Sequence, residues 1–146
     1  MSIERFIFVD GLPIPQGSKR HVGNGRMIES SAKLRPWRAT VSKAVVAANW
    51  PAHPILTDAV RVVLTFVMPR PKHRYRTGRH AADLKPNAPT HHTVPPDVDK
   101  LARAVLDALT DAGAWRDDAQ VASLEAYKEY GSKPGVLIRV VGADYA

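Results

Sequence analysis

Two pairs of aspartates in the stretch PPDVDKLARAVLDALTDAGAWRDD (residues 95–118) have types and spacing suited to chemistry. Asp97 and Asp99 stand one residue apart behind two prolines, and Asp117 and Asp118 follow one helix length later. Carboxylates gathered at one place repel each other unless protons or cations lie between them. Mg²⁺ binds a few carboxylates and keeps waters or phosphate oxygens as further ligands. The pattern therefore indicates metal-assisted chemistry on phosphates.

The same residues also have a structural interpretation. Asp97 stands where a helix N-cap is expected, and Asp99 would lie in the first turn, where the helix dipole favours negative charge. Asp99, Arg103 and Asp107 fall at i, i+4 spacing on the polar side of this helix. They could form a solvated ion-pair ladder, worth a few tenths of a kcal/mol per pair. Because two carboxylates at a helix start are common, the motif alone is a weak signal.

The flanking elements favour convergence of the acids. The proline pair holds the approach extended, and residues i and i+2 of an extended segment share a side, so Asp97 and Asp99 are expected to aim at a common point. Asp117 and Asp118 would begin a strand that returns beside the helix. Since neighbouring strand residues face opposite ways, only one of these two should point toward the first pair.

The remaining elements follow from periodicity and turn residues. We expect strands at 6–11, 26–30, 59–69, 119–131 and 135–142, a loop at 11–26, and helices at 30–50 and 97–113. The first helix should start near Arg35, with Pro36 in its first position and Ser30 or Ser31 as its cap, and the second should stop at Gly113. This order predicts one small α+β domain over residues 1–146, with a mixed sheet and two main helices. The nearly continuous apolar strand at 59–69 should be central, with both faces covered.

The chain is otherwise basic. Its 146 residues include 21 Lys and Arg against 14 Asp and Glu, for a formal charge of +7. This charge predicts a polyanionic partner, foremost nucleic acid, although it can also serve solubility alone. The segment from Arg70 to Thr93 contains six Lys or Arg, four His and one acid, with no hydrophobic periodicity. A loop of this length, at 70–94, is expected to be functional or flexible.

Several classes of protein and site are disfavoured. The absence of cysteine excludes disulfides and thiolate metal sites, and His91 and His92 lack a partner at zinc-ligand spacing. No apolar run approaches the ~20 residues needed to cross a membrane, and no basic amphipathic helix with bulky anchors stands out. The N-terminus lacks the features of a signal peptide. We therefore expect a cytoplasmic protein with no membrane partner.

Residues 95–121 (PPDVDKLARAVLDALTDAGAWRDDAQV) resemble the RusA family of Holliday junction resolvases. The shared pattern is Pro-Asp-x-Asp, a helix carrying Asp-Ala-Leu, a glycine-containing turn with Trp, and Asp-Asp-x-Gln-Val. The segments GLPIPQGSKR (11–20), LRPWRATV (34–41) and VRVVLTFVMP (60–69) are also similar to family members, especially phage and prophage ones. The resemblance implies an α+β homodimer that cuts four-way DNA junctions with Mg²⁺, or with Mn²⁺ as a substitute, in DNA recombination and repair. No nucleotide cofactor is implied, and the site of action is the cytoplasm of a bacterium or of a phage host.

The resemblance also implies roles for individual residues. The catalytic, metal-binding aspartates of the family fall on Asp97, Asp99 and Asp118. The best-known family pattern has a lysine four residues after the second aspartate and an asparagine directly after it, where this chain has Arg103 and Lys100. We expect Arg103 to take the place of the lysine at the scissile phosphate or to hold Asp99, with Lys100 as the alternative source of positive charge. Guanidinium and ammonium groups are not equivalent, because the guanidinium is fork-shaped and cannot give up a proton.

The other acids of the stretch, Asp107, Asp111 and Asp117, are expected to be structural or solvated. A junction enzyme should grip DNA mainly through phosphates. The candidate DNA-binding residues are Lys19, Arg20, Arg26, Arg35, Arg38, Arg70, Lys72, Arg74, Arg76 and Arg79. Two alternatives stay open: a non-catalytic module that binds branched DNA, whose acids are only caps and ion pairs, and a Mg²⁺-dependent nuclease acting on flaps, forks or RNA.

Overall fold

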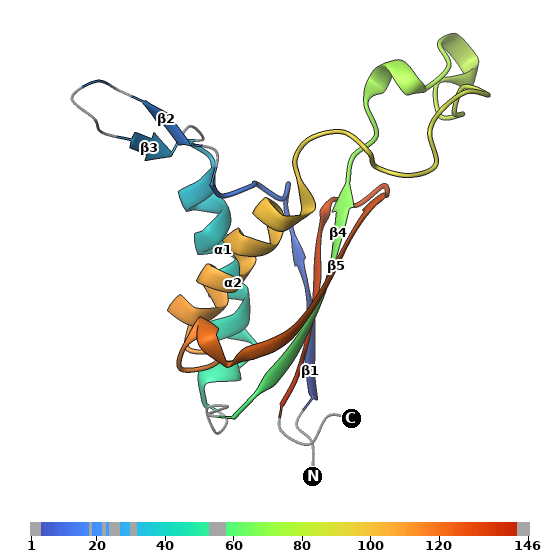
Figure 1. Ribbon diagram of the computed structural model, residues 1–146. Helices are drawn as coiled ribbons and strands as arrows, with labels where there is room; N and C mark the ends of the chain where they lie inside the picture. The colour runs from blue at the N-terminus through green and yellow to red at the C-terminus, as the bar shows by residue number, and fades with distance from the viewer. Residues whose placement is uncertain are drawn as a thin grey trace.

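The computed structural model describes residues 4–17, 19–21, 23, 27–29, 32–52 and 58–142. Within these residues a four-stranded sheet has the strand order β1-β6-β4-β5, and β2 and β3 form a separate hairpin. The strands are β1 (Glu4–Asp10), β2 (Lys19–His21), β3 (Met27–Glu29), β4 (Val60–Met68), β5 (Val121–Tyr130) and β6 (Gly135–Val141), and the helices are α1 (Leu34–Ala47) and α2 (Val98–Asp111). Both helices lie on one face of the four-stranded sheet (Figure 1).

The sheet is mixed, as the sequence predicts. β4 and β5 run parallel and are joined by the segment that carries α2, whereas β6 runs antiparallel to both β1 and β4. Parallel neighbours need such a long crossover, because a short turn can join only antiparallel strands. The result is the expected small α+β domain with two main helices.

The strand β4 is central, as expected, but the prediction that both its faces are covered is wrong. Its residues alternate, with Val62, Leu64 and Phe66 fully buried and Val63 and Val67 only partly buried. Successive strand residues point to opposite faces, so the second set lies on the side away from the helices. The apolar character of β4 thus reflects one face in the core and a second face that the helices leave uncovered.

Helix α1 begins at Leu34, slightly earlier than expected. Pro36 is therefore its third residue, where its missing N–H costs nothing because the first N–H groups of a helix lack intrahelical partners. The N-cap position is held by Lys33, whose side chain makes no capping hydrogen bond. The two serines proposed as caps, Ser30 and Ser31, lie outside the described residues.

Helix α2 lies within the segment predicted as a helix, 97–113. Leu101, Ala102, Val105 and Leu109 form a buried stripe against the core. Gly113, two residues beyond the last helical residue, has a φ of 78°, a conformation that glycine adopts without strain. The apolar stripe determines which side of α2 faces the core, so the polar side of α2 faces away from the sheet.

Two segments differ from a plain loop. The expected loop at 11–26 includes the short strand β2, which pairs with β3. The basic segment at 70–94 contains two 3₁₀ turns, η2 (Lys72–Arg74) and η3 (Gly78–His80), and an isolated bridge between Tyr75 and Leu84. In the part of the chain that the structure describes, no helix has the length and apolar character needed to span a membrane.

Candidate active site

The first acidic pair lies at the start of α2. Asp97 occupies the N-cap position with extended backbone angles, but its side chain makes no capping hydrogen bond and is 61% exposed. Asp97 therefore occupies the predicted N-cap position, but its carboxylate does not cap the helix. Asp99 lies in the first turn, where its negative charge is favoured by the helix dipole. Both carboxylates remain available to a ligand.

The approach to Asp97 is held by Lys128 on the strand β5. The Lys128 ammonium donates hydrogen bonds to the carbonyl oxygens of Val94, at 3.0 Å, and Pro96, at 2.9 Å. A backbone bridge between His91 and Glu129 brings the same segment alongside β5. A charged donor between two carbonyls fixes the residue directly before Asp97. Nothing in the sequence pattern indicated this role for Lys128.

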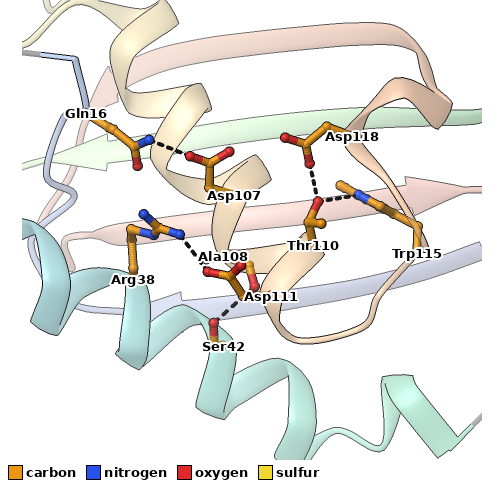
Figure 2. Close-up of polar contacts among 9 residues, drawn as sticks. All are labelled: Gln16, Arg38, Ser42, Asp107, Ala108, Thr110, Asp111, Trp115 and Asp118. Carbon is orange, nitrogen blue, oxygen red and sulfur yellow. Dashed lines mark hydrogen bonds and ion pairs between the residues drawn. The ribbon is translucent and has the colours of Figure 1, made fainter.

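Asp118 approaches α2 from the other end. The prediction that Asp118 begins a strand is wrong, because it opens the 3₁₀ turn η4 (Asp118–Gln120), and β5 starts only at Val121. The Thr110 hydroxyl donates a hydrogen bond to Oδ1 of Asp118, and the buried Trp115 indole donates to the same hydroxyl at 2.7 Å (Figure 2). This chain of donors orients the Asp118 carboxylate.

Its neighbour, Asp117, has a different task. The Asp117 carboxylate accepts a hydrogen bond from the backbone N–H of Ala119, at 2.8 Å, and the backbone N–H of Asp117 donates to the side-chain oxygen of Gln120, at 2.9 Å. This capping box begins the turn η4. The Asp117 carboxylate is thus used to cap the local backbone, whereas the Asp118 carboxylate bonds to the Thr110 side chain. This agrees with the expectation that only one of the two aspartates points toward the first pair.

Asp99 and Asp118 line the same hollow. This acidic hollow, with a volume of about 370 Å³, is lined by Val98, Asp99, Ala102, Arg103, Leu106, Asp107, Asp118, Leu124 and Ala126. Its apolar walls come from α2 and β5, and its polar groups are three carboxylates and one guanidinium. The guanidinium balances part of the negative charge, so the hollow suits both a cation and a phosphate.

Asp97 lines a second hollow on the other side of the start of α2. This proline-lined hollow has a volume of about 620 Å³ and is lined by Leu12, Pro13, Ile14, Pro15, Met68, Pro69, Pro71, His92, Val94, Pro95, Pro96, Asp97, Lys100 and Tyr130. The Lys100 ammonium lies 3.8 Å from Oδ2 of Asp97. Lys100 and Arg103, the two alternative cations, thus lie in different hollows. Lys100 lines the hollow of Asp97, and Arg103 lines the hollow of Asp99 and Asp118.

The three expected metal ligands are not gathered at one point. Among the described residues, no three His, Asp or Glu side chains lie close enough to hold a metal ion together. The structure brings Asp99 and Asp118 into one hollow and places Asp97 in its neighbour. A pair of carboxylates still fits Mg²⁺, which commonly binds through one or two carboxylates and completes its shell with water and substrate phosphate.

Comparison with known proteins identifies the family of this chain. Residues 10–141 match the family described as Endodeoxyribonuclease RusA. The chain belongs to the RusA family. Proteins named "Crossover junction endodeoxyribonuclease RusA" from Escherichia coli and Shigella sonnei are each 49% identical to it over 41 residues, which cover 28% of this chain and 34% of each relative. The aligned segment thus spans about a third of the length of these curated relatives.

One contact of this RusA family member was missed by reasoning from sequence. The side-chain amide of Gln16, from the segment before β2, donates a hydrogen bond to Oδ2 of Asp107 (Figure 2), and the Gln16 backbone amide donates to the carbonyl oxygen of Lys100 at 3.0 Å. The family-like segment GLPIPQG thus lies against the polar side of α2. Its proline and glycine content predicted only a loop, which carries no information on its partner.

The candidate DNA-binding residues fall into three groups. Two already have partners within the chain, because Arg38 pairs with Asp111 at 2.5 Å, and the Arg70 guanidinium lies 4.3 Å from the centre of the Tyr130 ring. Arg35, Lys72, Arg76 and Arg79 are exposed and Arg74 is partly buried. For Lys19 and Arg20 the structure describes only the backbone of β2, and Arg26 lies outside the described residues.

The basic segments flank the start of α2. The β2–β3 hairpin and the segment at 70–94 project from the same end of the domain, one on each side of the residues that lead into α2 (Figure 1). A polyanion that contacts both would pass over the start of α2. The sequence order already places the segment at 70–94 directly before the aspartates, and the structure adds the β2–β3 hairpin on the other side of the start of α2.

Proposed function

We propose that this protein is a Mg²⁺-dependent endodeoxyribonuclease that resolves four-way DNA junctions by paired phosphodiester hydrolysis in DNA recombination and repair. The observation that carries the proposal is the acidic hollow, where Asp99 and Asp118 face Arg103 in a chain of the RusA family. Its curated relatives are named crossover junction endodeoxyribonucleases. A DNA substrate would place the work of this protein in the cytoplasm of a bacterium or of a phage host.

The metal is assigned to the aspartates. Asp99 and Asp118, which line one hollow, would hold the ion, with Asp97, which lines the neighbouring hollow, as the third proposed ligand. When bound, Mg²⁺, or Mn²⁺ in its place, would supply an activated water and stabilise the charge on the leaving 3′ oxygen. Thr110 holds Asp118 in position for this task through its hydroxyl. The donor set consists of hard oxygens only, which favours Mg²⁺ over zinc.

Arg103 and Lys100 are assigned different roles toward the DNA. Arg103 shares the acidic hollow and would bind the non-bridging oxygens of the scissile phosphate through its fork of N–H groups. Lys100, next to Asp97, would neutralise that carboxylate and the approaching DNA backbone. Because a guanidinium does not release a proton, the leaving oxygen would be protonated by water.

Binding of the junction is assigned to the basic hairpin and loop. Each phosphate neutralised by Lys or Arg releases counterions, so the affinity should fall steeply with salt, by roughly 10³- to 10⁵-fold between low and moderate salt for six to ten contacts. A nearly flat salt dependence would exclude phosphate-dominated binding. The exposed residues Lys72, Arg76 and Arg79 are the first choice for substitution, because none of their side chains is needed to cover the core.

Paired cutting requires two active sites, and a two-fold homodimer supplies them. The sheet face opposite the helices supports such an assembly. On this face the side chains of Phe6, Tyr127 and Leu137 are 72%, 52% and 42% exposed. Exposed apolar groups grouped on one face are typical of interaction surfaces. A second copy packed against this face would complete the cover that β4 lacks in the single chain.

The deciding experiment is cleavage of a synthetic four-way junction with Mg²⁺. The wild type should make paired nicks, whereas Asp97→Asn, Asp99→Asn and Asp118→Asn should bind the junction and fail to cut it. Asp10→Asn, a change of the exposed aspartate that ends β1 and pairs with Lys133, is the matched control and should cut normally. Retained cutting by Asp99→Asn or Asp118→Asn would remove the metal assignment. Comparison of Arg103→Ala with Lys100→Ala then decides which cation acts at the phosphate, since loss in only the Lys100 variant would exclude Arg103.

A second candidate is a non-catalytic module that binds branched DNA. The observation in its favour is that no three acidic or histidine side chains of the described residues are gathered for a metal. On this alternative, junction binding would be tight and salt-dependent, and Mg²⁺ would produce no nicks. A nuclease that prefers flaps, forks or RNA would cut those substrates faster than a four-way junction in the same assay.

A further inference from the structure

The segment before β2 touches the same helical face as the proposed phosphate-binding group. Gln16 bonds to α2 twice, through its amide N–H to the Lys100 carbonyl oxygen at 3.0 Å and through its side chain to Asp107. Asp107 lies one turn beyond Arg103 on the polar side of the helix and lines the acidic hollow with it. The contact therefore fixes the segment at two points, one on each side of Arg103 along the helix.

The next residue, Gly17, lies directly on Arg103. A Cβ atom at Gly17 would stand 2.8 Å from Nη1 of Arg103 and 3.7 Å from its Cζ. Real Cβ atoms do not approach other heavy atoms so closely, so any larger residue would push the guanidinium aside. The backbone of Gly17 has a φ of 106°, which L-residues rarely adopt. The conformation therefore favours glycine here, and a larger residue would in addition displace the guanidinium of Arg103.

The contact between Gly17 and Arg103 involves the position at which this chain has arginine and the best-known family pattern has lysine. A guanidinium is wider than an ammonium and carries its charge on a planar fork, so it needs more room and a fixed orientation. Gly17 leaves that room, and Gln16 keeps the backbone of Gly17 against the helix. Gly17 thereby limits the movement of the flexible Arg103 side chain away from the acidic hollow.

We propose that Gln16 and Gly17 are positioning residues for Arg103, and that this pair holds its guanidinium in the acidic hollow beside Asp99 and Asp118. This inference rests on the proposed function, in which Arg103 binds the scissile phosphate. Confinement of a long side chain before substrate arrives reduces the freedom that is lost in the transition state. Gln16 acts only through Asp107 and the backbone, and Gly17 acts through the space it leaves.

The first test is a double-mutant cycle between Gly17 and Arg103. Gly17→Ala should reduce the turnover of junction cleavage by roughly 10- to 100-fold and leave junction affinity unchanged. In an Arg103→Lys background, which has no guanidinium for the new methyl to meet, the same change should cost less than about threefold. Equal losses in both backgrounds would overturn the proposal, because they would reflect backbone strain alone.

Gly23 provides the control for that strain. It also has a positive φ, 87°, but a Cβ there would meet nothing within 4 Å. Gly23→Ala therefore introduces a comparable conformational strain without displacing a side chain. We expect it to cleave at nearly the wild-type rate. A loss as large as that of Gly17→Ala would show that a strained glycine position, and not contact with Arg103, controls activity.

The second test exchanges charge between Gln16 and Asp107. Gln16→Glu places two carboxylates together and should lower turnover by about tenfold, whereas Asp107→Asn alone keeps an acceptor for the Gln16 amide and serves as the reference for the double variant. Combining Gln16→Glu with Asp107→Asn restores a donor and an acceptor and should recover cleavage. If Asp107→Asn alone abolishes cleavage, Asp107 acts directly in the site and the positioning role is wrong.

A measurement without substrate separates this inference from the proposed function. If the wild type fails to nick a junction, the proposed function fails, but thermal unfolding of the four proteins of the Gly17–Arg103 cycle still reports the contact. Non-additive shifts in melting temperature are expected, because two residues in contact are coupled. Additive shifts would show that Gly17 and Arg103 do not interact in the folded protein.

Discussion

The Thr110 hydroxyl donates a hydrogen bond to Oδ1 of Asp118 and accepts one from the Trp115 indole. Thr110 lies in the last turn of α2, whereas Asp118 lies in the turn that leads to β5. The two elements that carry the acidic clusters are thus joined by one hydroxyl group. A carboxylate at the surface of a short turn would otherwise have considerable rotational freedom.

This relationship predicts a selective loss of catalysis in Thr110→Val. Valine has nearly the same shape but no hydroxyl, so the Trp115 indole and the Asp118 carboxylate both lose their partner. We expect junction cleavage to fall about tenfold at unchanged junction affinity, an effect of the size expected when a reacting group is loosened. Thr110→Ser keeps the hydroxyl and should retain cleavage. Equal activity of the valine and serine variants would exclude an orienting role.

A second prediction concerns Lys128. Lys128→Met retains the aliphatic stem but removes the two hydrogen bonds to the carbonyl oxygens of Val94 and Pro96. Hydrogen bonds from a charged group are worth about 1.5–3 kcal/mol each, but the bond to Val94 is exposed to solvent and contributes less, so chemical unfolding should show a loss of roughly 2–4 kcal/mol for the pair. Cleavage should also fall, because the segment before Asp97 loses its support. Lys133→Met removes an ammonium that is 71% exposed and should change stability by less than about 0.5 kcal/mol.

The long regular elements could be read from the sequence. The stripe of Leu101, Val105 and Leu109 fixed the presence and rotation of α2, and β-branched residues predicted β4. The error on β4 has a physical cause. A strand that is apolar on both faces indicates cover on both sides, but a single chain cannot say whether its own helices or another copy provides that cover.

Sequence reasoning named candidate residues for the acidic site, but it did not predict how the structure arranges them. Spacing and resemblance indicated Asp97, Asp99 and Asp118, but an N-cap residue and a residue in the first helical turn project on different sides of the helix. The expectation of one common point assumed that the extended approach continues through Asp99. Contacts such as that of Gln16 with Asp107 depend on how a loop folds over a helix, and a glycine- and proline-rich sequence carries no periodic signal for this.

A third prediction tests the uncovered sheet face as a dimer interface. Phe6→Asp replaces the most exposed of the three apolar side chains on this face with a charge, on the edge strand β1 opposite Arg139, and removes its apolar contact with a second copy. We expect a wild-type dimer and a monomeric variant in sedimentation equilibrium, with the variant's circular dichroism unchanged. Val46→Asp, which alters an exposed apolar residue on α1, is the control. If the Val46 variant dissociates and the Phe6 variant does not, the dimer forms through the helical side.

The fourth prediction concerns the pH dependence of stability through His92. This side chain is only 7% exposed and packs against Tyr130 with ring centres 5.0 Å apart. Burial, followed by the positive charge of Lys128, lowers the pKa of His92 below its usual value of 6.5. The unfolded chain then takes up a proton at a pH at which the folded chain does not, so stability is full above about pH 6.5 and falls as the pH drops toward the lowered pKa.

Substitution of His92 should therefore flatten the acid side of the stability profile. His92→Gln removes the titrating group, and its free energy of unfolding should fall less between about pH 7 and pH 5 than that of the wild type. His73→Gln removes an exposed histidine from the basic loop and should follow the wild-type curve. The measurement is urea unfolding across this range for the three proteins. Parallel curves for all three would show that His92 does not resist protonation in the folded state, and its burial against Tyr130 and near Lys128 would then have no effect on stability in acid.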